Sequence, residues 1–275
     1  MFLSNFALMN KIILLSAVLF MLLSCSRKSE DKEAFRVETI NKITPVKDQG
    51  NSSLCWAYAM LATIESEHLM KGDSVNLSAV YVARNMLREQ AERCYLTAGR
   101  AGFTTRATAP RLIALIQQTG LMPFDSYRSD CNFNALCRKL SVLCRSSVTR
   151  RTGLEALMRN TDDLFDDEIN PVPWHVWMLG AEYTPQEFAR SVCRDDEYQA
   201  LTSFTHKPFY ENIVLDVPDN RSGDKFYNVP IDTLMSRIET ALRRGHSVCW
   251  EGDVSEPGFS FERGVARLGD NRHMA

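Results

Sequence analysis

The chain has 275 residues, a hydrophobic fraction of 45%, and 32 basic against 34 acidic side chains, which gives a formal net charge of −2 at pH 7. This length is enough for one large domain or for two small ones around a cleft. The near balance of charge argues against nucleic acid as the partner, because nucleic-acid-binding domains carry a basic surface.

The first 24 residues have the pattern of a targeting segment rather than of a folded element. Lys11 is their only charged residue, and an apolar run follows it from 12 to 23. This run is about half of the roughly 20 residues that a membrane span needs, so it fits the apolar core of a signal peptide. The run closes with Leu-Leu-Ser-Cys at residues 22–25. This ending resembles the lipobox of bacterial lipoproteins, where cleavage leaves a lipidated cysteine at the new N-terminus.

The lipobox resemblance predicts a lipoprotein signal peptide at residues 1–24, lipidation of Cys25 and a polar tether at 25–41. It implies a location in the bacterial cell envelope, periplasmic or surface-exposed, with the membrane as a partner through the lipid anchor. The alternative is an uncleaved signal anchor, since residues 1–23 are apolar enough to span a membrane. Either interpretation places the rest of the chain outside the cytoplasm.

Residues 45–58 carry the strongest motif, and they read Pro-Val-Lys-Asp-Gln-Gly-Asn-Ser-Ser-Leu-Cys-Trp-Ala-Tyr. Gln49 precedes Cys55 by six positions, Gly50 favours a turn between them, and Trp56 follows the cysteine. A helix predicted over 54–69 places Cys55 in its first turn, where the positive helix end stabilises a thiolate, the nucleophilic form of cysteine. The Cys55 backbone N–H and the Gln49 side-chain amide can together stabilise a developing oxyanion.

This motif resembles the active-site segment of the papain-like cysteine peptidases. Ser52 stands where that family's signature has a first cysteine, which is similar to the bleomycin hydrolase (aminopeptidase C) branch. The resemblance implies an α+β fold with a helical left subdomain and an incomplete β-rich right subdomain, spanning residues 42–275. It makes Cys55 the nucleophile, Gln49 an oxyanion donor and Trp56 a substrate-binding residue. The alternative is that Cys55 is an ordinary buried thiol.

The remaining elements are mostly predicted to be helical. Hydrophobic spacing, proline positions and turn residues predict helices within 76–92, 109–118 and 132–167, a helix starting at 184–185, one over 228–244, and a strand at 247–254. Gly120 is expected to end the second of these helices. The resemblance also implies that Gly102, in the 99–105 loop, contributes to a cleft wall that binds the substrate backbone. A plain loop glycine is the alternative.

The family resemblance also requires a histidine that pairs with the cysteine and an asparagine that orients the ring. His273, followed by Met274 and Ala275, lies where that histidine is expected, and the asparagine run that follows it in the family is absent from the sequence. The sequence therefore predicts a domain truncated after its catalytic histidine. The other four histidines, at 68, 175, 206 and 246, are expected to be structural or at the surface, and His246 is the competitor to His273.

The cysteine pattern leaves several pairings open. Of the eight cysteines, Cys25 and Cys55 have assigned roles, and the remaining six permit up to three disulfides. Buried free thiols or one local disulfide are the favoured interpretations. The spacing of Cys131, Cys137 and Cys144 matches no zinc motif, and the acidic residues at 162–168 lack the spacing of a calcium-binding loop.

These observations predict a cysteine-type peptidase that hydrolyses peptide bonds through an acyl-enzyme, with peptides or proteins as substrates and oligomers possible. The bleomycin hydrolase branch suggests N-terminal trimming, the aminopeptidase activity. Such a site needs no metal or organic cofactor. The alternative is a truncated, inactive relative that acts as a membrane-tethered peptide-binding lipoprotein.

Overall fold

The computed structural model describes residues 36–178 and 180–267. Every element below belongs to one compact unit that begins at Thr39. The predicted signal peptide, the predicted lipidation site Cys25 and the candidate base His273 lie outside the described residues.

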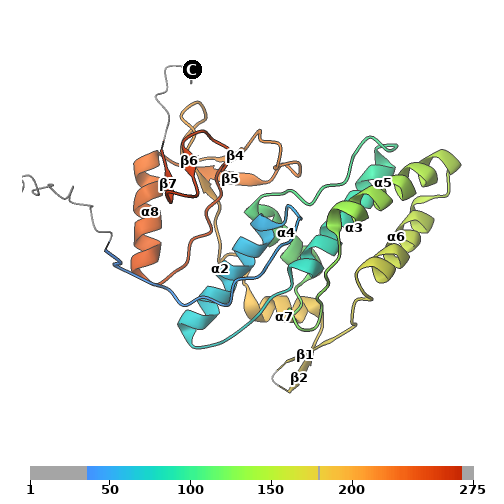
Figure 1. Cartoon of the computed structure of the whole chain (residues 1–275), viewed down its shortest axis with the longest axis horizontal. Coiled ribbons are helices and arrows are strands. Elements are labelled where there is room, and N and C mark those ends of the chain that lie inside the picture. Colours follow the sequence, from blue (N-terminus) through green and yellow to red (C-terminus); the bar gives the residue numbers. More distant parts are fainter. Residues whose placement is uncertain (1–35, 179, 268–275) are drawn as a thin grey trace, which may run out of the picture. The chain divides into compact units, whose positions relative to one another are not determined.

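Helices dominate the described part of the chain (Figure 1). They are α2 (Cys55–Lys71), α3 (Ala79–Leu96), α4 (Ala109–Thr119), α5 (Phe133–Arg150), α6 (Leu154–Glu168), α7 (Pro185–Val192) and α8 (Ile231–Arg243).

The strands are short and form three small sheets. They are β1 (Val176–Met178), β2 (Ala181–Tyr183), β3 (Leu201–Thr202), β4 (Asn212–Val214), β5 (Lys225–Asn228), β6 (Phe259–Ser260) and β7 (Val265–Ala266). The pairs β1–β2 and β6–β7 are antiparallel hairpins. In the third sheet β5 lies in the centre, parallel to β3 and antiparallel to β4.

Local capping explains where several helices begin and end. The Ser78 hydroxyl accepts a hydrogen bond from Tyr81 N at the start of α3, and Thr184 and Glu187 form a reciprocal capping box at the start of α7. The expected stop of α4 at Gly120 is confirmed, with φ +82°. A Cβ atom at this position would lie 2.3 Å from the backbone carbonyl of Pro185, so only glycine fits.

Helix α2 lies in the interior and packs against α3 and α4. Its buried positions fall on nearly all sides of the helix, as expected for a helix surrounded by protein. Helix α3 in turn packs against α5 and α6, which also pack against each other (Figure 1). The buried residues of the main hydrophobic core all lie between Leu54 and Cys193, so the core belongs to the helical part of the fold.

The predicted strand at 247–254 is wrong. Residues 246–253 form no strand in the described part of the chain. Side chains satisfy two of their polar groups instead of a neighbouring strand: Ser247 N donates to the Glu67 carboxylate (2.9 Å), and the Ser247 hydroxyl lies 2.6 Å from that of Ser66. The segment is therefore held against α2 by side chains of that helix.

Of the two interpretations of the cysteines at 131–144, free thiols hold for Cys131 and Cys137, whereas Cys144 forms a disulfide with a distant residue instead of a local one. Cys94 of α3 and Cys144 of α5 form a disulfide across 50 residues of sequence. The packing of these two helices brings the Cα atoms to 6.6 Å, within the range that a disulfide requires. Cys131 and Cys137, the nearer neighbours in sequence, are free thiols.

Two further sequence expectations concern membranes and metals. Across residues 36–178 and 180–267, no helix combines the length and the apolar character that crossing a membrane requires. The same residues contain no group of three or more His, Cys, Asp or Glu side chains placed to hold a metal ion.

Candidate active site

Cys55 is the first residue of α2, and its side chain is exposed. The preceding residue, Leu54, occupies the N-cap position, and no side chain caps this helix. Ala57 N and Tyr58 N donate to the Leu54 carbonyl, whereas the N–H of Cys55 donates to no acceptor among the described residues. The first turn therefore presents an exposed thiol beside an unused backbone donor, the arrangement that stabilises negative charge at a helix N-terminus.

The loop before α2 is shaped by a tight turn at Gly50, where φ is +58°. Asp48 Oδ1 accepts a hydrogen bond from Gly50 N (2.7 Å), and the Ser52 hydroxyl donates to the Gln49 carbonyl (2.6 Å). The Gln49 side chain is half-buried, and its Oε1 atom is fully shielded from solvent without a hydrogen-bond partner in the described part of the chain. The side-chain NH₂ group of Gln49 also donates no hydrogen bond in this part of the chain, so its N–H donors remain available to a group that enters the site.

Trp56 fixes the start of α2 to the 99–105 loop. Its side chain is 3% exposed, and its indole N–H donates to the Thr105 carbonyl (2.8 Å). Ser53 N donates to the Thr105 hydroxyl (3.2 Å). Trp56 therefore supports the segment that carries Cys55 from within the core, and direct contact between Trp56 and a substrate stays a prediction.

A buried carboxylate on α2 holds the segment that leads to Gln49. Glu65 is 0% exposed and accepts hydrogen bonds from the Thr44 hydroxyl, the Lys47 ammonium and Leu77 N, the last at 2.6 Å. Lys47 and Thr44 lie in the extended stretch just before Gln49. The sequence analysis missed Glu65, because it lies in the polar run at 65–68, where nothing in the sequence marks one carboxylate as buried.

The position of His246 excludes it as the partner of Cys55. Its Nδ1 atom lies 3.0 Å from Glu67 Oε2, near the C-terminal end of α2. Glu67 follows Cys55 by twelve residues on the same helix, which corresponds to about 18 Å at 1.5 Å per residue. His68 is also structural, because it binds Asp73 and the Val192 carbonyl. His273 remains the candidate base, outside the described residues.

Gly102 is exposed in the loop between α3 and α4. A Cβ atom at this position would meet no atom within 4 Å, and the backbone does not require glycine there. No steric reason therefore distinguishes Gly102 from other loop residues, and its contact with substrate backbone stays a prediction.

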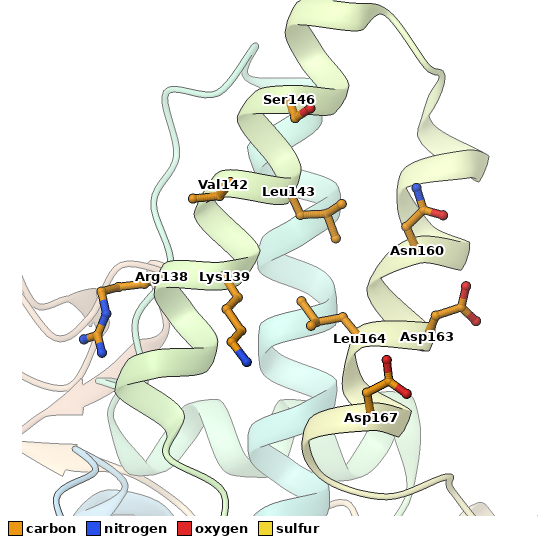
Figure 2. A pocket seen from close by; sticks show the side chains of 9 residues that line it. All are labelled: Arg138, Lys139, Val142, Leu143, Ser146, Asn160, Asp163, Leu164 and Asp167. Atoms are coloured by element: carbon orange, nitrogen blue, oxygen red, sulfur yellow. The ribbon is translucent and has the colours of Figure 1, made fainter.

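A separate cavity of about 680 Å³ lies between α5 and α6 (Figure 2). Val142, Leu143 and Leu164 supply its apolar part. None of the candidate catalytic residues lines it, so it is not the site of the chemistry that Cys55 supports.

Burial sets the other free thiols of the described region apart from Cys55. It raises the pKa of Cys137 to about 11, that of Cys249 to about 11 and that of Cys193 to about 12. Burial also raises the pKa of Cys131. These thiols are mostly protonated near neutral pH and therefore weak nucleophiles.

The geometry agrees with what comparison with known proteins shows. A profile described as "Papain family cysteine protease" matches residues 31–201, more than half of the chain. The chain therefore belongs to the papain family of cysteine proteases.

Individual relatives match over shorter stretches. A viral cathepsin of Choristoneura fumiferana defective polyhedrosis virus is 32% identical over 100 residues, which cover 35% of this chain and 28% of that protein. Digestive cysteine proteinase 1 of Homarus americanus is 28% identical over 129 residues, covering 44% of this chain and 36% of the relative. The chain thus spans only about a third of the length of these relatives.

Among solved structures, the chain is similar to PepW from Lactobacillus rhamnosis HN001, with a TM-score of 0.57 and 17% sequence identity. The match covers 78% of this chain and 59% of the PepW chain. The two proteins share a fold, which confirms the predicted α+β, papain-like architecture.

Proposed function

We propose that this chain is a cysteine-type peptidase whose nucleophile is Cys55. One observation carries the proposal: in a papain-family domain, the exposed Cys55 thiol opens helix α2 beside a backbone N–H with no other acceptor. The Gln49 side-chain NH₂ group, which donates no hydrogen bond in the described part of the chain, supplies a second donor. Peptides or proteins are the substrates that this chemistry serves.

In the proposed mechanism, the Cys55 thiolate attacks the peptide carbonyl carbon, and a C–S bond forms. The Cys55 N–H and the Gln49 side chain stabilise the resulting oxyanion. The C–N bond then breaks as His273, protonated by the thiol, transfers its proton to the leaving amine. A water molecule deprotonated by His273 attacks the thioester, the C–S bond breaks, and the carboxylic acid leaves with the thiolate restored.

The finer proposal is aminopeptidase C-like trimming, with Gly102 binding the substrate backbone. Its support is the serine at position 52 and the order of motifs that resembles the bleomycin hydrolase branch. A peptide series with free and acetylated N-termini tests it. We expect cleavage of the free series and at least a tenfold lower kcat/KM for the acetylated series, roughly the loss of one charge-assisted contact. Equal rates would indicate an endopeptidase.

For location, we propose attachment to the bacterial cell envelope through lipid on Cys25. The support is the apolar run and the Leu-Leu-Ser-Cys ending at residues 22–25. Labelling cells with an alkyne fatty acid should mark the wild-type protein and not the Cys25→Ala variant. Labelling that persists in the variant would contradict lipidation at this residue.

The principal test of the peptidase proposal treats the full-length chain, purified in detergent, with an epoxide inhibitor of cysteine peptidases at pH about 7. We expect one adduct, on Cys55, detected by peptide mass spectrometry, because the Cys55 side chain is exposed whereas burial raises the pKa of the other described free thiols. His273→Ala should slow the reaction, and Cys137→Ser, the matched control, should leave it unchanged. Folded protein without an adduct on Cys55 would contradict the proposal and favour a peptide-binding role without catalysis.

A further inference from the structure

A second cavity, of about 280 Å³, lies between α3, the loop at 100–107, the start of α4 and the β4–β5 loop. Its lining includes one carboxylate, Glu89, and five arginines: Arg93, Arg100, Arg106, Arg111 and Arg221. The α5–α6 cavity differs, because its two basic side chains are matched by the two acidic ones that Figure 2 labels. The smaller cavity therefore favours a negatively charged occupant.

Three of the five arginines already have carboxylate partners. Glu89 bridges Arg93 (3.0 Å) and Arg111, and Arg106 pairs with Asp219 (2.7 Å). The Arg111 side chain is 8% exposed, and burial lowers its pKa. These two carboxylates offset part of the charge of the three arginines, and the remaining two arginines add to the positive excess.

Arg100 and Arg221 form no ion pair with any residue in the ranges 36–178 and 180–267. Arg100 uses only its Nε atom, which donates to the Thr97 carbonyl (3.1 Å), and the Arg221 side chain makes no hydrogen bond in those ranges. Asp224 is the other carboxylate close to Arg111, and burial raises its pKa. Two planar guanidinium groups from separate loops thus line one cavity with their donors unused, a geometry suited to carboxylate or phosphate oxygens.

We propose that this cavity binds a small oxyanion group, held by Arg100 and Arg221. Every candidate ligand carries a negatively charged group with two or more oxygen acceptors. It can come from the acidic side chain of a peptide or from a free inorganic anion such as phosphate.

The loop at 100–107 connects this cavity to the candidate active site, so an anion bound in the cavity would affect the segment that carries Cys55. On the cavity side, the backbone N–H and carbonyl of Thr104 bind the Gln90 side chain (2.8 and 2.9 Å). The next residue, Thr105, binds Trp56 and Ser53 at the start of α2. An anion that joins Arg100 to Arg221 would therefore stabilise the same loop that anchors the segment carrying Cys55.

The first test titrates the full chain with inorganic phosphate at constant ionic strength, followed by ³¹P NMR. We expect saturable binding that the Arg100→Gln/Arg221→Gln double variant weakens by about tenfold or more. The matched control is Arg237→Gln, because this exposed arginine of α8 does not line the cavity. Absence of saturable binding, or equal affinity in the double variant, would overturn the proposal.

A second measurement identifies the source of the anion, and it rests on the proposed peptidase function. Two peptides that differ only in Glu against Gln are titrated calorimetrically into the Cys55→Ser variant, where no turnover occurs. Tighter binding of the Glu peptide that disappears with Arg100→Gln/Arg221→Gln supports a substrate side chain. Equal peptide affinities together with phosphate binding support a free anion. If neither peptide binds, the peptidase proposal fails, while the phosphate titration still decides the anion site.

Discussion

Two polar side chains that contact or belong to the segment before Cys55 are used in opposite ways. The Glu65 carboxylate accepts hydrogen bonds from three donors, whereas the Gln49 Oε1 atom is shielded and has no partner in the described part of the chain. Shielding a polar atom without a hydrogen bond costs about 1–3 kcal/mol. Glu65 therefore stabilises the fold, while Gln49 retains capacity that a reacting group can use.

Gln49→Ala should lower kcat by about 100-fold to 1,000-fold and change KM little, because an oxyanion donor acts mainly in the transition state. Steady-state kinetics on a peptide substrate measures both constants. Gln118→Ala, at an exposed position of α4, is the matched control. An equal loss in kcat for the two variants, or a rise in KM alone, would contradict the proposed role of Gln49.

Glu65→Gln should lower the free energy of unfolding by about 3 kcal/mol, because it leaves the Lys47 ammonium largely shielded without its charge partner. Urea unfolding followed by circular dichroism measures the change. Adding Lys47→Met to Glu65→Gln should recover part of the loss, since it removes the unpaired charge. A double variant less stable than Glu65→Gln alone would show that the pairing is not the cause.

At the scale of elements, α3 connects the active-site region to the outer helices. It packs on α2 and α4 on one side and on α5 and α6 on the other. Arg84 of α3 donates to Asp166 of α6 (2.8 Å) and to the Asn170 carbonyl (2.9 Å). The Cys94–Cys144 disulfide adds a covalent link from α3 to α5.

Replacing both disulfide cysteines, Cys94→Ala/Cys144→Ala, should lower the free energy of unfolding by about 2–4 kcal/mol, because the bond closes a long loop in the unfolded chain. Urea unfolding under non-reducing conditions measures this loss. Cys137→Ala, which removes a free thiol on the same helix, is the control. Unchanged stability of the double variant would mean that the bond contributes little to folding.

At the scale of the whole molecule, polar contacts join residues 201–267 to the helical part of the fold. Arg106 pairs with Asp219, and Ala109 N at the start of α4 donates to Glu251 (2.9 Å). Helix α8 buries none of its residues, and its apolar side chains Ile231 and Met235 are exposed. The stability of this part therefore depends on individual ion pairs and hydrogen bonds more than on a shared apolar core.

Asp224, on the β4–β5 loop, provides a test of these polar contacts. Burial raises its pKa above the usual 3.8, although Arg111 opposes the shift, and its Oδ2 atom has no hydrogen-bond partner among the described residues. A raised pKa in the folded state means that the folded protein accommodates the neutral acid form of Asp224 more favourably than the charged form. The wild type should therefore lose stability relative to Asp224→Asn as the pH rises above the pKa of Asp224 in the unfolded chain.

The measurement is urea unfolding of wild type and Asp224→Asn at pH about 4 and about 7. We expect the free energy of unfolding of Asp224→Asn to rise relative to that of the wild type from pH about 4 to pH about 7. Asp216→Asn, at an exposed position before the same loop, should show no such trend. If the wild type instead becomes more stable relative to Asp224→Asn as the pH rises, the attraction of Arg111 for the Asp224 carboxylate outweighs the effect of burial on its pKa.

Local patterns in the sequence predicted much of the fold. Helix spacing and caps located α2, α3, α4 and α7 to within a few residues, and the position of Cys55 in the first turn of α2 is confirmed. These features depend on neighbours along the chain, such as the Ser78 cap of α3. The family also follows from the local motif at 45–58, since the matching profile covers residues 31–201.

What the sequence could not determine depends on which distant residues meet. The Cys94–Cys144 pair, the burial of Glu65 against Lys47, and the placement of His246 beside Glu67 each join positions that meet only in the folded chain. The 247–254 segment is not a strand, because a strand needs a neighbouring strand for its backbone hydrogen bonds. Here a side chain of α2 accepts the hydrogen bond of Ser247 N instead. The sequence by itself determined the helices, the position of Cys55 in the first turn of α2 and the family. The tertiary structure alone decided the disulfide, the support beneath the active-site segment and the arginine-lined cavity, because these arise from contacts between elements far apart along the chain.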